Sequence, residues 1–130
     1  MDLLEPYMKS GLGIALKASN GKFWTRWGGW EIRAAKENKD PYTKFDIIKV
    51  DNNTIRLKNS DNEQYLTRWS AIYIYARKAS PDIYCNFLVY EVDGKLVLKN
   101  VSNGKFVARY HYYTRCLILK CAKVNASEVQ

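Results

Sequence analysis

Asn20-Gly21-Lys22-Phe23-Trp24-Thr25-Arg26-Trp27 decides the fold of this chain, because the same pattern occurs three times. It returns as Asn62-Glu63-Gln64-Tyr65-Leu66-Thr67-Arg68-Trp69 and as Asn103-Gly104-Lys105-Phe106-Val107-Ala108-Arg109-Tyr110, at intervals of 42 and then 41 residues. Each copy has a polar turn, an aromatic residue, a second large apolar residue, a small residue, Arg, and then Trp or Tyr. Self-similarity at a fixed period predicts a fold that is built from repeated units.

Each copy is flanked by further predicted strands. Upstream lie short alternating stretches at 14–17, 55–58 and 96–99, in which apolar residues two apart are typical of half-buried strands. Downstream, residues 45–50 and 87–92 predict a fourth strand in the first two units. Three units of four short strands, each about 41 residues long, predict an all-β protein of the β-trefoil type, because a propeller needs ~4 or more blades.

The 130 residues are expected to form one domain, with repeats at about 12–50, 54–92 and 95–130. The third repeat is truncated, since its third strand is expected at 117–121 and too few residues follow for a fourth. An unpaired barrel edge is a liability. The tail at 127–130, the leader at 1–11 or another chain is therefore expected to complete the barrel.

Turn residues mark the connections between these strands. Trp27-Gly28-Gly29-Trp30 predicts a tight turn with Trp30 at its exit. Asp40-Pro41 marks a loop, and Asp51-Asn52-Asn53 and Asp93-Gly94 mark the turns between repeats.

Composition narrows the function classes. The net charge of +8 favours acidic partners, but Lys and Arg are scattered with no block of five, so nucleic acid is not expected as a partner. Cys85, Cys116 and Cys121 show neither CxxC spacing nor a nearby His cluster, which predicts free thiols and no metal site. We expect no signal peptide, no membrane span, and a location in the cytoplasm or the nucleus.

Catalysis and cofactor binding have little support in the sequence. The chain has one His, no Gly-rich phosphate loop and no HExxH motif, so we expect no enzymatic activity and no cofactor.

The second repeat resembles a known family. Gln64-Tyr65-Leu66-Thr67-Arg68-Trp69-Ser70, followed by Pro81-Asp82 and Cys85-Asn86-Phe87, resembles the agglutinin domain of amaranthin-like plant lectins, with Gln64 where the family has Lys. The resemblance covers roughly residues 12–122. It implies a β-trefoil that binds galactose- or N-acetylgalactosamine-type glycans and glycoproteins in a shallow site between subunits, and therefore a homodimer. The family's sugar-contacting stretch follows the Trp-Ser with a Tyr-Trp, which is Tyr73 and Ile74 here.

Residues that recur in every repeat are expected to serve the fold. We interpret Phe23, Tyr65 and Phe106 as core residues, and Trp27, Trp69 and Tyr110 as packing in the core or in the hairpins. For Arg26, Arg68 and Arg109 we expect a structural role, stacking on rings or bonding to turn carbonyls.

Residues that differ between repeats, at or beside the hairpin turns, are better candidates for ligand contact, because such loops give specificity to a rigid scaffold. Sugars stack on aromatic rings. The predicted carbohydrate-binding residues are Trp30, Ser70, Tyr73, Tyr75, His111, Tyr112 and Tyr113.

Two other functions stay open. The same fold can serve as an interaction module that binds an acidic partner, such as anionic lipid, actin or a sulfated glycan, through its basic surface. A protease-inhibitor trefoil is the other rival, although such inhibitors are usually secreted and disulfide-bonded.

Overall fold

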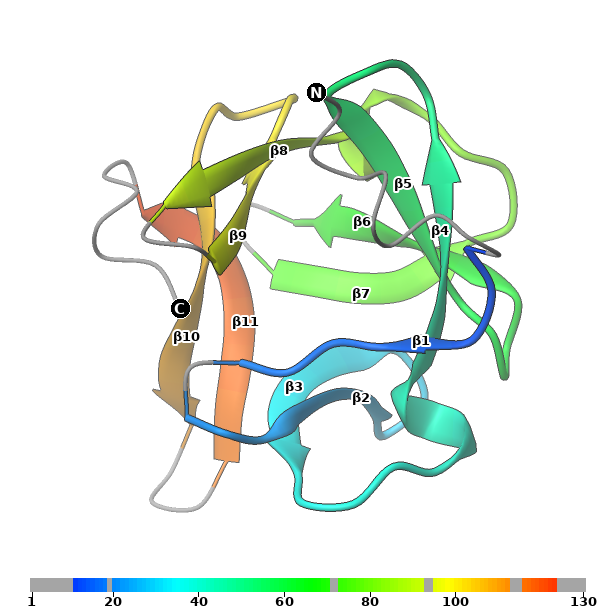
Figure 1. The fold of residues 1–130 in the computed structure, drawn as a ribbon, viewed down its shortest axis with the longest axis vertical. Helices are drawn as coiled ribbons and strands as arrows, with labels where there is room; N and C mark the ends of the chain where they lie inside the picture. Colours follow the sequence, from blue (N-terminus) through cyan, green and yellow to red (C-terminus); the bar gives the residue numbers. More distant parts are fainter. Residues whose placement is uncertain (1–10, 19, 71–72, 93–94, 113–115, 124–130) are drawn as a thin grey trace.

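Eleven short strands form most of the computed structural model, which describes residues 11–18, 20–70, 73–92, 95–112 and 116–123, with side chains as far as Ala108 (Figure 1). Two single 3₁₀ turns, η2 and η3, precede β4 and β8. The elements are β1 (Ile14–Ala15), β2 (Phe23–Trp27), β3 (Glu31–Lys36), η2 (Pro41–Thr43), β4 (Lys44–Lys49), β5 (Thr54–Asn59), β6 (Gln64–Trp69), β7 (Tyr73–Lys78), η3 (Ile83–Cys85), β8 (Phe87–Val92), β9 (Lys95–Asn100), β10 (Phe106–Tyr112) and β11 (Cys116–Lys123). The all-β prediction is confirmed.

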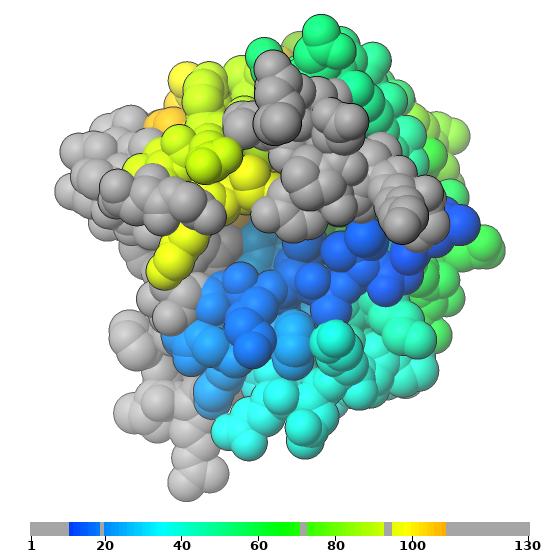
Figure 2. Space-filling view, viewed as in Figure 1, coloured from blue at the N-terminus to red at the C-terminus, as the bar shows by residue number. Residues whose placement is uncertain are grey.

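The described strands join one antiparallel sheet in which three hairpins meet. The hairpins are β2–β3, β6–β7 and β10–β11. Their outer strands pair with one another, β3 with β7, β7 with β11 and β11 with β3. Beyond the hairpins, β4 pairs with β5 and β8 with β9 over most of their length, and shorter pairings join β1 to β4 and β5 to β8. Residues of the first repeat lie together on the face in Figure 2, with β1 and β2 in blue beside the cyan residues that follow.

The predicted strands agree closely with the observed ones. Strands β5, β8, β9 and β11 contain the predicted stretches, and β4 ends one residue earlier than expected, at Lys49. The predicted strand at 14–17 is reduced to β1, with a further bridge between Lys17 and Phe23. At the start of the described chain, the Gly11 carbonyl accepts a hydrogen bond from the Ile47 N–H at 2.7 Å. The Asp93-Gly94 turn and the tail at 127–130 lie outside the described residues.

The Asn that opens each copy of the repeated sequence makes the same turn. The side-chain oxygens of Asn20, Asn62 and Asn103 each accept a hydrogen bond from the backbone N–H two residues later, at 3.0 Å. The next residue is left-handed in every copy, with φ of 81° at Gly21, 57° at Glu63 and 67° at Gly104. Glycine adopts this conformation at no steric cost, whereas Glu63 adopts it at the cost of a close contact with its Cβ.

A β-bulge directly after this turn decides which residues enter the core. The register shifts between Phe23 and Trp24, and it shifts at the equivalent positions in β6 and β10. The extra residue lies on the second strand of each hairpin, at Ala35, Arg77 and Ala122, and such a bulge changes which residues of the paired strands face inward. Trp24 is therefore buried and packs edge-on against Phe45, with ring centroids 6.4 Å apart. Leu66 and Val107 occupy the equivalent buried positions in the other two hairpins.

The core interpretation is consequently wrong for Phe23 and Tyr65, which are half-buried, and confirmed for Phe106, which is 8% exposed. A lysine at the end of the preceding strand lies over each of these rings. The distances from Nζ to the ring centroid are 5.1 Å for Lys17, 5.4 Å for Lys58 and 5.6 Å for Lys99. The long aliphatic stems of these lysines can cover apolar surface that the bulge leaves outside the core.

The loops before β4 and β8 are closed by equivalent contacts in the first two repeats. The Asp40 carboxylate accepts from the Tyr42 N–H at 2.9 Å, and Asp82 accepts from the Tyr84 N–H at 3.0 Å. Each aspartate also pairs with a lysine four residues earlier, at 3.0 Å in both cases. These loops place Tyr42 and Tyr84 beside the hairpins, where both are more than a third exposed.

Candidate functional site

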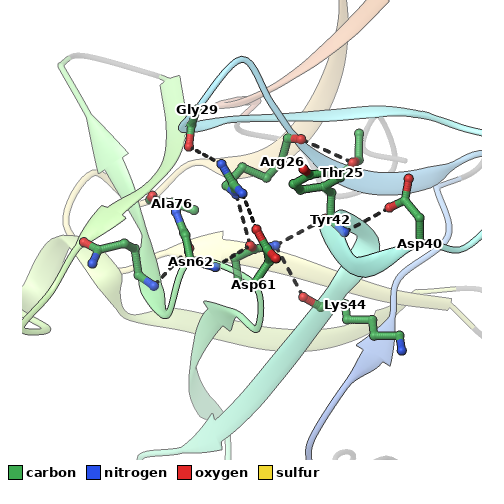
Figure 3. A network of polar contacts seen from close by, with 11 residues as sticks. Thr25, Arg26, Gly29, Asp40, Tyr42, Lys44, Asp61, Asn62 and Ala76 are labelled. Atoms are coloured by element: carbon green, nitrogen blue, oxygen red, sulfur yellow. Dashed lines mark hydrogen bonds and ion pairs between the residues drawn. The ribbon is translucent and has the colours of Figure 1, made fainter.

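Arg26 and Arg68 join the first and the second hairpin to the following repeat, and Figure 3 shows the contacts of Arg26. Arg26 donates to the Gly29 carbonyl at 2.8 Å and to the Asn59 side-chain oxygen at 3.2 Å, and it pairs with Asp61. Its guanidinium carbon lies 5.0 Å from the centre of the Tyr42 ring. These contacts use three of the five N–H donors of Arg26 inside the fold.

Arg68 repeats this arrangement in the second hairpin. It donates to the Ser70 carbonyl at 2.9 Å and to the Ser102 hydroxyl at 2.8 Å, and it lies 5.0 Å from the Tyr84 ring centre. The predicted structural role of the arginines is therefore confirmed for Arg26 and Arg68. The Arg109 side chain lies outside the described part of the structure.

A cleft of about 290 Å³ opens beside the turn of the first hairpin. Trp27 and Tyr42 contribute rings that are 40% and 44% exposed. The lining residues are Arg26, Trp27, Gly28, Gly29, Lys36 and Tyr42. Arg26 uses three of its donors inside the fold and Lys36 pairs with Asp40, so the most accessible groups in the cleft are the side chains of Trp27 and Tyr42.

A continuous row of stacked side chains runs across the second hairpin. Tyr73 stacks on Tyr75 with ring centroids 6.0 Å apart, and Tyr75 stacks on Trp69 at 6.2 Å. The guanidinium carbon of Arg77 then lies 4.3 Å from the Trp69 ring centre and 4.1 Å from the Trp30 ring centre. We call these five residues the aromatic ladder.

The alternation of β7 explains why three residues of the aromatic ladder share one face of this strand. Ile74 and Ala76 point inward and are 1% and 0% exposed, so Tyr73, Tyr75 and Arg77 lie on the outer face. Trp69 on β6 is paired directly with Tyr73 across the hairpin. Cross-strand neighbours of this kind lie within reach of each other's rings.

The last member, Trp30, comes from the first repeat. Strand β3 pairs with β7 between Glu31 and Tyr75, and the Trp30 carbonyl accepts a hydrogen bond from the Ala76 N–H at 2.7 Å. This places the indole of Trp30 against Arg77 while 47% of the residue stays exposed. Two repeats therefore build the ladder together.

The predicted site residues fall into two groups. Trp30, Tyr73 and Tyr75 lie in the aromatic ladder, and Ser70 lies at the exposed hairpin turn next to it, with a left-handed φ of 58°. His111 and Tyr112 belong to β10, but their side chains lie outside the description, as does all of Tyr113. The structure therefore places four of the seven candidates together.

Sequence reasoning missed two members of the ladder. The recurrence of Trp or Tyr at the position of Trp69 predicts a packing role for it, and the repeat pattern gives no signal at Arg77. The spacing of Tyr73, Tyr75 and Arg77 is the signal that could have found Arg77, because residues two apart on a strand share a face.

The described residues also bear on a metal site, a reactive thiol and a membrane-spanning helix. Among the described residues, no three His, Cys, Asp or Glu side chains gather closely enough to hold a metal ion. The buried thiol of Cys85 is free, as predicted, and burial raises its pKa. Within the same residues, no helix has the length and apolarity to cross a membrane.

Comparisons with known proteins show similarity in fold. No protein-family model matches the sequence, and no curated protein sequence matches it. A chain in the crystal structure of the Haemophilus ducreyi cytolethal distending toxin is similar, with a TM-score of 0.73 and 16% sequence identity. The match covers 89% of this chain and 75% of that chain. At this identity the likeness concerns the fold alone.

Proposed function

We propose that this protein is a β-trefoil lectin of amaranthin-like type, which binds galactose- or N-acetylgalactosamine-type glycans through the aromatic ladder and has no enzymatic activity. The observation that carries the proposal is the ladder itself, a row of stacked rings on the outer face of a rigid hairpin. Sugars bind such surfaces by stacking their apolar faces on the rings.

Three further observations support the details. The three hairpins share the same bulge and pair with one another, as three units of a trefoil would. The family resemblance places sugar contact just after Trp69-Ser70, and that stretch leads into Tyr73 of the ladder. Ile74, where the family has Trp, is buried in the core, so the outer face here is built from other rings.

From the resemblance we also propose a homodimer in the cytoplasm or nucleus. A shallow site of exposed rings can serve as a glycan site and a subunit contact together, because both uses need accessible apolar surface. Two linked sites would raise the avidity for glycoproteins.

The test is a glycan array at ~0.15 M salt with the parent protein, Trp30→Ala, Tyr73→Ala and Trp27→Ala. Trp27 is the matched control, because it is a similarly exposed tryptophan that lines the cleft and lies outside the ladder. We expect galactose-type glycans to bind the parent and Trp27→Ala, and the two ladder variants to lose binding while keeping their far-UV circular dichroism. Loss of binding in Trp27→Ala alone would move the site to the cleft. A parent that binds no glycan would contradict the lectin proposal.

A second candidate function is an interaction module for an acidic partner, such as anionic lipid or actin. Lys17 and Lys39 lie on the same ring, Phe23, with Nζ 5.1 Å and 5.7 Å from its centre, and neither forms an ion pair with a described carboxylate. The net charge of +8 adds a general attraction to anions. Binding to anionic liposomes that falls steeply between ~0.05 and ~0.3 M salt would favour this candidate.

A further inference from the structure

Arg77 differs from the other arginines whose side chains the structure describes. Arg26, Arg33, Arg56 and Arg68 each donate a hydrogen bond to a carboxylate, an amide, a hydroxyl or a carbonyl. Arg77 donates to no described acceptor, and it takes no part in the described ion pairs. Its guanidinium carbon nevertheless lies close to two indoles, 4.1 Å from the Trp30 ring centre and 4.3 Å from the Trp69 ring centre.

These two distances are the shortest between a cation and a ring among the described residues. A guanidinium has five N–H donors in its plane and no acceptor. Because two indole rings lie against this guanidinium, its N–H donors are most available at the edge of its plane. Such an edge matches the two oxygens of a carboxylate or a sulfate, which can accept two parallel hydrogen bonds.

We propose that the ligand of the aromatic ladder is an acidic glycan, whose carboxylate or sulfate ester pairs with the edge of Arg77 while a sugar ring stacks on Trp30 or Tyr73. This inference rests on the proposed lectin function and specifies its substrate class. Trp30 is 47% exposed, so one ligand can reach the indole and the neighbouring guanidinium together. The two indoles position the Arg77 side chain before the ligand arrives, which lowers the entropy that this side chain loses on binding.

The experiment measures affinities for three matched sugars, namely lactose, lactose with a 3′-sulfate, and lactose with a 3′-linked sialic acid. Calorimetry at ~0.15 M salt is run on the parent, Arg77→Gln, Arg77→Lys and Lys39→Gln. We expect the parent to bind at least one acidic sugar about tenfold more tightly than lactose. In Arg77→Gln that sugar should bind within about threefold of lactose, as the ratio of the two affinities measured on the same variant. Arg77→Lys keeps the charge but not the planar fork, so it should retain only part of the preference.

Lys39→Gln is the matched control, because it removes one positive charge outside the ladder. We expect it to leave the ratio of acidic to neutral affinity unchanged. An equal loss in Lys39→Gln and Arg77→Gln would mean that general charge selects the acidic sugar, and would overturn the proposal. Equal affinity of the parent for all three sugars would overturn it as well, even if Arg77→Gln did not fold. Failure of the parent to bind any sugar would instead contradict the lectin function, and this inference would fall with it.

Discussion

Replacing Arg26 by Ala should destabilise the protein by about 2–3 kcal/mol, whereas the same change at Arg77 should cost about 1 kcal/mol or less. The two arginines form a natural comparison. Arg26 connects the turn of its own hairpin to Asn59 and Asp61 of the next repeat, and it stacks on Tyr42 (Figure 3). Arg77 contacts only rings among the described residues.

The magnitude for Arg26 follows from its separate contacts. The ion pair with Asp61 is partly exposed, with side chains 14% and 36% accessible, so it is worth about 1 kcal/mol at most. The stacking on Tyr42 adds about 0.5–1 kcal/mol. The hydrogen bonds to Gly29 and Asn59 add about 1 kcal/mol together, because water can replace Arg26 at Gly29 and the Asn62 N–H still donates to the Asn59 oxygen.

Urea denaturation, followed by tryptophan fluorescence and by far-UV circular dichroism, measures the difference. With an m value of about 1.5–2 kcal/mol per M, the midpoint of Arg26→Ala should fall by about 1–2 M. A double-mutant cycle with Asp61→Asn should give a coupling energy of about 0.5–1 kcal/mol. The reasoning is refuted if Arg26→Ala unfolds within about 0.5 kcal/mol of the parent, or if Arg77→Ala is equally destabilising.

Three further predictions concern the repeated turns and the loop before β8. Glu63→Gly should raise the free energy of unfolding by about 0.5 kcal/mol, because glycine adopts the left-handed φ without strain. Gly21→Ala should lower the free energy of unfolding by about 1 kcal/mol because of its left-handed φ, although an added Cβ meets no atom within 4 Å. Melting temperatures equal to that of the parent would contradict both predictions. Asn62→Ala should cost about 1–2 kcal/mol in urea, because the Gln64 N–H and the Ala76 carbonyl both lose a partner, and a loss below about 0.3 kcal/mol would disprove that role. Burial raises the pKa of Asp82, but its pairing with Lys78 outweighs this and lowers the pKa below 3.8, so its stabilisation is present above pH 3.8 and is lost as the pH falls through the folded-state pKa. Asp82→Asn should therefore weaken the loss of stability on acidification below pH 3.8, and an unchanged pH profile would count against the pairing.

Much of the fold could be predicted because its signals are local. The period of about 41 residues, the alternating stretches and the turn residues all lie within short segments of chain, so they predicted the hairpins and most strand positions. Asp40 and Asp82, like Lys36 and Lys78, stand 42 positions apart in the first two repeats, and the two Lys–Asp pairs make equivalent contacts in the structure. The structural role expected for Arg26 and Arg68 followed from the same repetition.

The bulge was not predictable from the pattern alone. Phe23 and Trp24 are adjacent aromatic residues, and alternation permits either of them to face inward. The turn at Asn20 and the extra residue of β3 at Ala35 set the register of this hairpin, and this register places Trp24 rather than Phe23 in the core. The choice depends on a partner strand and not on the segment itself.

The sequence by itself determined the repeated hairpins and the residues of each turn, because hydrogen bonds and periodicity within about ten residues specify them. It also indicated that Trp30, Tyr73 and Tyr75 are special, since they differ between otherwise similar units. Only the tertiary structure decided that they belong to one surface. Strand β3 of the first repeat pairs with β7 of the second, and this pairing sets Trp30 against Arg77, 47 positions away in the chain. A contact between side chains so distant in sequence depends on the pairing of whole repeats, and no local pattern records which faces will meet.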